Sequence, residues 1–431
     1  MSNMMNKAQG FGLSLITKIA GSEVLDQLKL RKFIEKSLYQ GSKTGFKVLN
    51  KTQKAFKPQA IDKQRLPNQV NKNLFDLSLT EEQQMTVDAM SQFAEEVLYA
   101  LAHDADHQAQ FPEQLWQHLV DLGLNYYALP EALGGVAAEQ NIVSNILIAE
   151  SLAKGDFSLT AGLLSTFSVI NAITRWGSTQ VQSMYLPVFA EDTDVTATFA
   201  FQEATPAFNP YQLKTKATEQ NGQMTITGEK TLVILGDTAD VFLVSAEFNG
   251  QPDIFVVQSN ETIAIKANPA MGLKATETAT LHFNQTPALR LGDADFDYTA
   301  FVDLGNLMWC AMAIGTGEAI KAYCIKYANE RTAFGEPISH RQSVAFMIAD
   351  MAIEIDAMRM LVLNAASLAE AGQPFHREAY LARLLCAEKS MKIGTDGVQI
   401  LGGHGFTKEH PVERWYRDLR ATAILHSGLH A

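Results

Sequence analysis

The feature that most constrains this chain is a block of strand-like sequence enclosed by two long helical regions. Between Val195 and about Asp295, apolar residues recur with a period of two, and the pairs Asn221-Gly222 and Asn249-Gly250 are typical of hairpin turns. On both sides of this block the apolar period is helical. Strands that stand in one block, rather than alternating with helices, favour separate domains over βαβ units. We therefore expect an α+β protein.

The domain boundaries follow from these changes of period. We expect an N-terminal helical domain at residues 78–194, a central antiparallel β-domain at 195–297 and a C-terminal helical bundle at 298–431. The first helix of the body should begin after Thr80, because Thr80 and Gln83 have the spacing of a capping box. The uncharged stretch from Phe157 to Thr174 contains several Ser, Thr and Asn residues, so we expect a buried helix there rather than a membrane span.

Residues 1–77 form a basic arm. Residues 1–75 hold fourteen Lys and Arg but four acidic residues, and since the whole chain carries −12, the remainder carries −22. Residues 22–38 have roughly helical apolar spacing, with lysines on another face. Two interpretations stay open: peripheral contact of residues 1–75 with an anionic membrane, each cation adding on the order of 1 kcal/mol, or packing against the body or a partner subunit. The acidic body argues against a nucleic-acid partner.

Cysteine usage and the N-terminal sequence indicate the compartment. The three cysteines, Cys310, Cys324 and Cys386, are odd in number and form no C-x-x-C pair, which indicates reduced thiols in a core. The first lysine is not followed by the long apolar core and small-residue cleavage site of a secretory signal. We expect a cytoplasmic protein, associated with a membrane if the arm binds one.

The helical region after residue 298 carries an ordered series of short motifs, and earlier regions carry the landmarks Ala128–Gly135, Trp176–Gln180 and Gly228–Lys230. In order, the C-terminal motifs are Arg331-Thr332-Ala333-Phe334-Gly335, Gln342, Gln399-Ile400-Leu401-Gly402-Gly403-His404-Gly405-Phe406 and Arg414-Trp415-Tyr416-Arg417-Asp418. This series resembles the acyl-CoA dehydrogenase family, over roughly residues 78–428. The resemblance implies that family's fold: a helical domain, a β-domain and a helical bundle.

The resemblance also implies a function. Members of that family are FAD-dependent oxidoreductases that dehydrogenate acyl-CoA thioesters between the α- and β-carbons and pass electrons to an electron-accepting flavoprotein. It implies a homodimer or homotetramer in which FAD straddles two subunits. Gln202 stands where a threonine bonds the flavin ring, and an amide can do so as well. On the C-terminal side, Arg331 would pair with the pyrophosphate, and the other implied cofactor contacts are Phe334, Gln342, Gln399, Gly402 and Gly403.

Departures from the family pattern gather on the β-domain half of the cofactor site. Phe208 stands where a serine meets a phosphate, Leu232 replaces a tryptophan that covers the flavin, and Ile234 replaces a threonine donor. Each lost polar contact costs about 1 kcal/mol or more. Because the C-terminal half is intact, a second hypothesis stays open. In it, the chain is a catalytically degenerate member that forms a hetero-oligomer with a family paralogue and completes the partner's FAD site.

The family's catalytic glutamate, which removes the α-proton, is replaced here by His426. A second position used in some branches falls on Gly305, next to Asn306. An imidazole with an ordinary pKa of about 6.5 is a competent base at neutral pH, so His426 is the candidate catalytic residue and Asp303 a weaker alternative. Five residues follow His426, and we expect them to fray. His426 and His430 lie four apart, but no acid or thiol completes a metal set with them.

Overall fold

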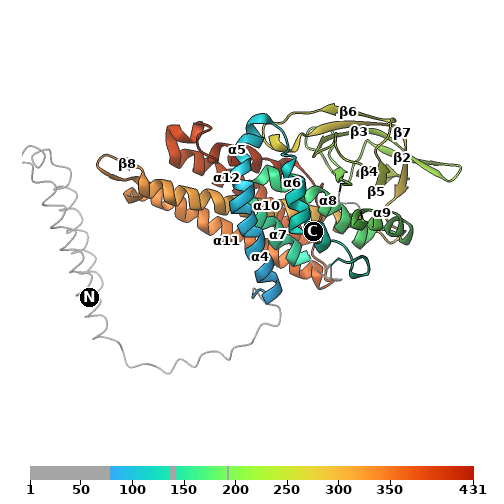
Figure 1. Ribbon diagram of the computed structural model, residues 1–431, viewed down its shortest axis with the longest axis horizontal. Coiled ribbons are helices and arrows are strands. Elements are labelled where there is room, and N and C mark those ends of the chain that lie inside the picture. Colours follow the sequence, from blue (N-terminus) through green and yellow to red (C-terminus); the bar gives the residue numbers. More distant parts are fainter. Residues whose placement is uncertain (1–77, 136–141, 192–193) are drawn as a thin grey trace, which may run out of the picture. The chain divides into compact units, whose positions relative to one another are not determined.

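The computed structural model describes residues 78–135, 142–191 and 194–431. The basic arm, with its expected helix at 22–38, lies outside the described residues, so membrane contact through it stays a prediction. The described residues form a first set of helices, then a β-sheet, then a second set of helices (Figure 1). The predicted α–β–α architecture is confirmed, whereas the domain boundaries at residues 78, 195 and 298 remain a proposal.

The first helix begins where the sequence predicts. The Thr80 hydroxyl accepts from the Gln83 N–H, and the Gln83 side chain accepts from the Thr80 N–H, which completes the capping box. The helices of this region are α4 (Glu81–Phe93), the π-helical turn η1 (Ala94–Leu98), α5 (Tyr99–Gln108), α6 (Gln114–Leu122), η2 (Leu124–Tyr127), η3 (Glu131–Leu133), α7 (Ile142–Ala153), α8 (Phe157–Trp176) and α9 (Thr179–Glu191).

Helix α8 is the buried helix that the uncharged stretch predicts. It begins at Asp156, whose carboxylate accepts a hydrogen bond from the Leu159 N–H at 2.9 Å. The helix is long and apolar enough to cross a membrane, but 94% of its most apolar window is buried inside the protein. Its apolar surface is therefore covered by the other helices and by strand β1.

Within the described residues, seven strands form one sheet. They are β1 (Ala197–Ala200), β2 (Lys216–Gln220), β3 (Gln223–Val233), β4 (Val241–Phe248), β5 (Gln251–Gln258), β6 (Ile263–Ala267) and β7 (Ala279–Arg290), with the short helix η4 (Lys274–Thr276) before β7. The two predicted hairpins are present: Asn221-Gly222 joins β2 to β3, and Asn249-Gly250 joins β4 to β5. All four of these turn residues have positive φ.

The antiparallel prediction holds for most pairs but not for β1. Strand β1 runs parallel to β4, with Ala197 opposite Val241, and β2 meets β4 in parallel at its first residue. The physical reason is the connection. A two-residue turn forces neighbouring strands to run antiparallel, whereas β1 leaves the sheet through a long loop before β2 begins, and that loop leaves its direction free.

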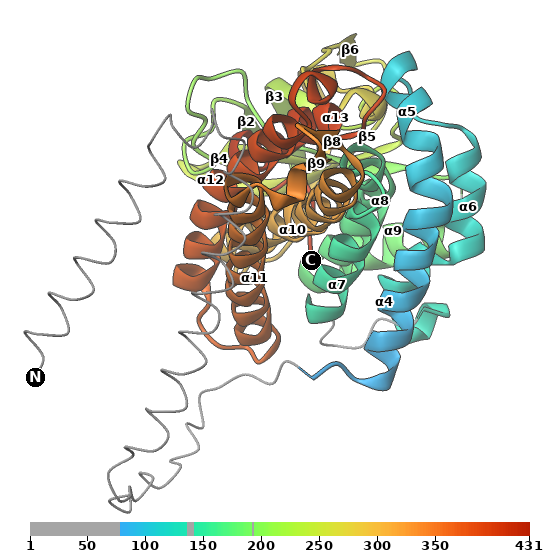
Figure 2. The same cartoon turned by 90° about the vertical axis from the view of Figure 1, so that its left-hand side faces the viewer.

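The C-terminal region is built around one long buried helix. Helix α10 packs against α7, α11 and α12, and Figure 2 shows α11 and α12 beside it. The elements here are α10 (Tyr298–Glu330), β8 (Thr332–Ala333), β9 (Glu336–Pro337), η5 (Ile338–His340), α11 (Gln342–Glu370), α12 (His376–Leu401), η6 (Gly402–Phe406), α13 (Val412–Leu419) and α14 (Ala421–Ile424). Short connections reverse the chain twice, so α10 and α12 end at the same end of the bundle.

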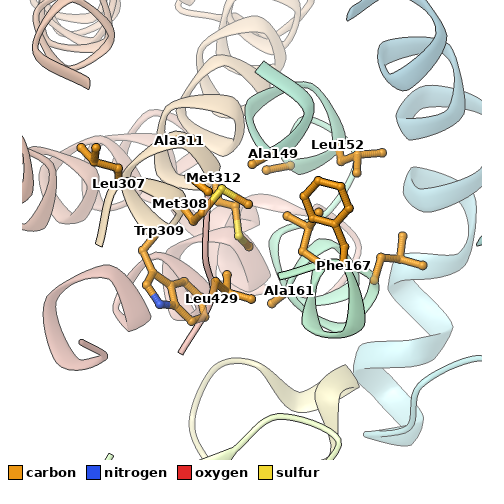
Figure 3. Close-up of a cluster of buried hydrophobic side chains, with 14 of the residues drawn as sticks. Ala149, Leu152, Ala161, Phe167, Leu307, Met308, Trp309, Ala311, Met312 and Leu429 are labelled. Atoms are coloured by element: carbon orange, nitrogen blue, oxygen red, sulfur yellow. The ribbon is translucent and has the colours of Figure 1, made fainter. Parts of the chain in front are cut away.

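The largest hydrophobic core joins both helical regions. Figure 3 shows part of it, where side chains of α7, α8 and α10 meet Leu429. Cys310, Cys324 and Cys386 are all buried and form no disulfide. Burial raises the pKa of the Cys324 thiol to about 12, so the reactive thiolate does not form there at neutral pH.

Candidate cofactor and catalytic site

A buried ion pair fixes the backbone on both sides of Gln202. The Lys230 ammonium, which is completely buried, donates to the Phe201 carbonyl at 3.1 Å, to the Glu203 carboxylate at 2.9 Å and to the Ser245 hydroxyl at 2.9 Å. Burial lowers the pKa of Lys230 to about 8, with the Glu203 charge opposing that shift. The residues before and after Gln202 are therefore both anchored to one cation.

The Gln202 side chain bonds the last residue of α14. Its Nε2 donates to the Ile424 carbonyl at 3.3 Å, whereas its Oε1 is buried without a hydrogen-bond partner among the described residues. A buried acceptor left unpaired costs free energy. A ring N–H at this point would satisfy it, so the residue type fits a flavin contact, although its present bond is to the chain itself.

His426 and Gln202 line the same cavity. The cavity has a volume of about 20 Å³ and lies between the sheet and α10. His426 is the only titratable residue in its lining, whose other members are Phe199, Phe201, Leu232, Ile234, Trp309, Leu425, Ser427 and Gly428. Gln202 and Ser427 contribute neutral polar side chains to this lining, and Phe199, Phe201 and Trp309 contribute aromatic rings.

The imidazole of His426 is half-buried and neutral at neutral pH. Its ring lies 6.0 Å from that of Phe208, edge to face. Burial lowers the pKa of His426 to about 4, and the positive charge of Arg383 contributes to the shift. The neutral ring can accept a proton, but a lowered pKa makes it a weaker base than an ordinary histidine. Arg383, on α12, carries no motif that would have marked it in the sequence.

A second cavity adjoins the first. It has a volume of about 80 Å³, and Leu232 and Leu425 line both. The rest of its lining is Ala270, Met271, Gly272, Leu273, Arg417, Arg420, Ala421 and Ile424. A volume of about 20 Å³ holds roughly one water molecule.

The other six candidates line neither cavity and lie at the end of the helical bundle. Arg331 follows the last residue of α10 and is exposed. Phe334 is 96% exposed, has a φ of +56° in the β8–β9 turn, and lies 5.7 Å from the Arg341 guanidinium. Gln342 is the exposed first residue of α11. All three residues are exposed, so another molecule can reach them.

Gln399, Gly402 and Gly403 complete this end of the bundle, and all three are exposed. Gly402 has a φ of +60°, and a side chain at either glycine would meet nothing within 4 Å. The Tyr327 hydroxyl, on the last turns of α10, bonds the His404 ring at 2.7 Å and so joins this group to the preceding three. We call the six residues the dinucleotide corner: Arg331, Phe334, Gln342, Gln399, Gly402 and Gly403.

The alternative base and the histidine pair have other partners. The Asp303 carboxylate pairs with His376 Nδ1 at 2.7 Å, and burial raises the pKa of Asp303 to about 6, but it does not line the cavity of His426. His430 Nε2 accepts a hydrogen bond from the Trp176 indole at 2.9 Å. That nitrogen is therefore not free to bind a metal together with His426.

The prediction that the residues after His426 fray is wrong. Ser427, Leu429 and His430 are completely buried, and Ala431 is nearly so. Frayed ends are typical where few side chains are covered, whereas this segment enters a space prepared by α8 and α10. No local pattern in the last residues shows this, because the space is made by residues more than 100 positions away.

Comparison with known proteins agrees along the whole body of the chain. Three family models match in order: the acyl-CoA dehydrogenase N-terminal domain at residues 80–193, the middle domain at 198–286 and the C-terminal domain at 299–428. An acyl-CoA dehydrogenase of Bacillus subtilis (strain 168) is 30% identical over 365 residues, which cover 81% of this chain and 95% of the relative. The chain belongs to the acyl-CoA dehydrogenase family.

Members of the acyl-CoA dehydrogenase family are flavin-dependent oxidoreductases of acyl-CoA thioesters. A short-chain specific acyl-CoA dehydrogenase of Megasphaera elsdenii is also 30% identical, over 81% of this chain and 95% of its own length. The solved structure of butyryl-CoA dehydrogenase from the same organism gives a TM-score of 0.74 at 28% identity, covering 82% of this chain and 96% of that one. The fold and family that the motifs indicate are confirmed, and the roles of individual residues remain proposals.

Proposed function

We propose that this chain is an FAD-dependent oxidoreductase of the acyl-CoA dehydrogenase type that forms a double bond between the α- and β-carbons of an acyl-CoA thioester. The observation that carries the proposal is the position of His426, the only titratable side chain in the cavity between the sheet and α10. Membership of the family supports the substrate class. Bound FAD would supply the acceptor for the β-hydride, and an electron-accepting flavoprotein would reoxidise it.

In this proposal His426 takes the α-proton onto a ring nitrogen. The ring is neutral at neutral pH, as a base must be, because burial keeps its pKa near 4. The lowered pKa also reduces the driving force for proton transfer. We therefore expect slower chemistry than a glutamate with a raised pKa would give in a similar cavity.

The dinucleotide corner would hold the pyrophosphate and adenosine parts of an FAD that belongs to a neighbouring subunit. Three observations support this role. Arg331 has no carboxylate partner among the described residues, Phe334 is almost completely exposed, and the space above Gly402 and Gly403 is open. A homodimer, a homotetramer or a hetero-oligomer with a paralogue would all bring such a corner to a second subunit.

The proposed base is tested by replacing His426. His426→Ala should lower kcat with butyryl-CoA, hexanoyl-CoA and octanoyl-CoA by about 10²–10⁴-fold, the usual contribution of a general base, with a smaller change in KM. Reduction of an artificial electron acceptor measures turnover. His282→Ala is the matched control, because His282 is exposed on β7 and should leave kcat unchanged. Equal turnover of His426→Ala and the unaltered protein would remove His426 from the mechanism.

A non-catalytic subunit is the second candidate function, and two observations favour it. The Gln202 side chain donates to the Ile424 carbonyl of the chain itself at 3.3 Å, whereas the space above Gly402 and Gly403 in the dinucleotide corner is open. Visible absorption separates the candidates. An enzyme should be yellow when purified alone and bleach when acyl-CoA is added. A non-catalytic subunit should be colourless alone and acquire flavin when co-expressed with a complete family paralogue, and Arg331→Ala should then reduce the flavin content of the complex.

A further inference from the structure

Residues 427–431 follow His426 directly and lie inside the protein. We call Ser427–Ala431 the inserted segment. Ser427, Leu429 and His430 are 0% exposed and Ala431 is 3% exposed. In Figure 3, Leu429 lies among the core side chains of α8 and α10, close to Trp309. The segment thus fills interior volume and does not cover a surface.

Specific hydrogen bonds hold the inserted segment. The Trp309 indole N–H donates to the Ser427 carbonyl at 2.5 Å, and the Ser427 N–H donates to Asn306 Oδ1 at 3.0 Å. At the other end of the segment, the Trp176 indole N–H, which is partly buried, donates to His430 Nε2 at 2.9 Å. Buried donors and acceptors are costly when unpaired. We call the Trp309 and Trp176 indoles and the Asn306 amide the seat of the segment. Their polar groups need hydrogen-bond partners, and the segment supplies them.

A single glycine of α10 makes room for the segment. A Cβ at Gly305 would lie 2.6 Å from the Leu429 carbonyl oxygen and 2.7 Å from Ser427 Cα, which are distances that real side chains do not adopt. Even an alanine at 305 would push the segment outward. Gly317 offers a comparison on the same helix, because a Cβ there would approach nothing closer than 3.3 Å, at Ile355.

The seat of the inserted segment adjoins the cavity of His426. Ser427, Gly428 and Trp309 line that cavity, and about 20 Å³ remains empty. If a thioester placed its α-carbon at His426, as the proposed function requires, its acyl chain would need a much larger apolar space beyond. The adjoining core volume is already taken by the segment. The segment and an acyl chain would then compete for one space.

We propose that the inserted segment is an internal competitor of the acyl group, so that an acyl-CoA buries its chain only after Ser427–Ala431 leaves its seat. This inference rests on the proposed function. The residues that set the strength of the competition are Trp309, Asn306 and Trp176, with Gly305 as the position that permits it. Free CoA carries no acyl chain, so its binding does not require the interior space that the segment fills.

The test measures binding to the full chain, separately from turnover. Octanoyl-CoA and free CoA are titrated by calorimetry into the unaltered protein, Gly305→Ala, His430→Ala and the control Gly317→Ala, while tryptophan emission is recorded. Gly305→Ala and His430→Ala should bind octanoyl-CoA at least ten-fold more tightly than the unaltered protein and Gly317→Ala. All four should bind free CoA alike. In the unaltered protein, octanoyl-CoA should shift the emission as Trp176 and Trp309 lose their partners.

Gly305→Ala and His430→Ala weaken the segment's position in different ways. If one of them does not fold, the other still tests the proposal. Near-ultraviolet circular dichroism shows which of them is folded. Equal octanoyl-CoA affinity in all four proteins, with unchanged emission, overturns the competition and leaves the proposed function standing. Hydrogen exchange adds a separate outcome. If the segment is released in the variants and none of them prefers octanoyl-CoA over free CoA, the competition and the proposed function both fail.

Discussion

The Lys230–Glu203 pair shows how one buried cation can hold a functional turn. Lys230 spans the sheet from β3 to the loop after β1 and meets a carbonyl, a carboxylate and a hydroxyl there. A buried ion pair often adds little net stability, because both charges lose their water. Removal of one partner, in contrast, destabilises the protein, because the other charge is left buried and unpaired. The pair therefore fixes the position of Gln202 more than it strengthens the fold.

Lys230→Met should destabilise the protein by about 3–5 kcal/mol, because the Glu203 carboxylate then stays buried without its cation. Urea unfolding followed by circular dichroism gives the free energy of unfolding. Lys266→Met is the matched control, since Lys266 is exposed on β6 of the same sheet and its loss should change stability by less than about 0.5 kcal/mol. Similar stabilities for the two variants would contradict this account.

Single residues also show what the sequence could and could not predict. Gln202 and His426 could be singled out as candidates, because each has a fixed place in a run of motifs that defines the family fold, and both line one cavity. Arg383 and Trp309 were missed. Arg383 lies in mid-helix among ordinary helix formers, and Trp309 reads as one more apolar residue of α10. Their importance arises from packing against residues distant in sequence, which no local pattern encodes.

At the level of elements, the boundaries that depend on local chemistry were predictable. The capping box at Thr80 and the two Asn-Gly turns are set by neighbouring residues. The parallel direction of β1 and the burial of the inserted segment were not predictable. The direction of β1 depends on its pairing with β4, and the burial of the inserted segment depends on its contacts with α10. The stability that these contacts add cannot be judged from the sequence of β1 or of the segment alone.

His430 makes the seat of the inserted segment sensitive to acid. Burial, with the nearby Arg175 charge, lowers the pKa of His430 to about 3, whereas the unfolded chain has an ordinary value of 6.5. The folded state therefore binds fewer protons than the unfolded state between these values. Its stability is fully present above pH 6.5 and is lost as the pH falls toward 3. The pKa of His426 in the folded state is about 4, so His426 also lowers the stability of the folded state as the pH falls.

His430→Gln should reduce this acid sensitivity, because glutamine can accept from the Trp176 indole without titrating. Each titrating histidine contributes up to about 1.4 kcal/mol per pH unit within its window. The variant retains His426, so its unfolding free energy should still fall between pH 6.5 and pH 4.5, but by less than that of the unaltered protein. Urea midpoints at half-unit pH steps measure it. Parallel curves for the two proteins would show that His430 is not a determinant.

Considered as a whole, the molecule has an apolar stripe on its outer helices. Phe346, Ile353 and Met360 are exposed on α11 at intervals of seven residues, so they lie on one face, and Tyr380 and Leu384 are exposed on α12 beside it. Exposed apolar residues that gather in this way are typical of contacts between subunits. The stripe and the dinucleotide corner both begin around the start of α11, which supports an oligomer as part of the proposed function.

Ile353→Asp should weaken this assembly, because it places a charge in the middle of the stripe. Size-exclusion chromatography with light scattering should show a lower mass than for the unaltered protein at the same concentration. Met85→Asp is the matched control, since Met85 is exposed on α4 and outside the stripe. An identical mass for Ile353→Asp and the unaltered protein would exclude the stripe as a subunit contact.

The Asp156 carboxylate, which caps α8, affects how the chain folds while it is being synthesised. Asp156 Oδ2 accepts from Arg414 Nε at 2.8 Å, both groups are nearly completely buried, and 258 positions separate them. Contacts between such distant residues slow folding, because the intervening chain must close first. Although α8 leaves the ribosome early, its capping carboxylate has no counter-ion until α13 has been translated. Nascent chains that stall before α13 should therefore stay open to proteases and chaperones.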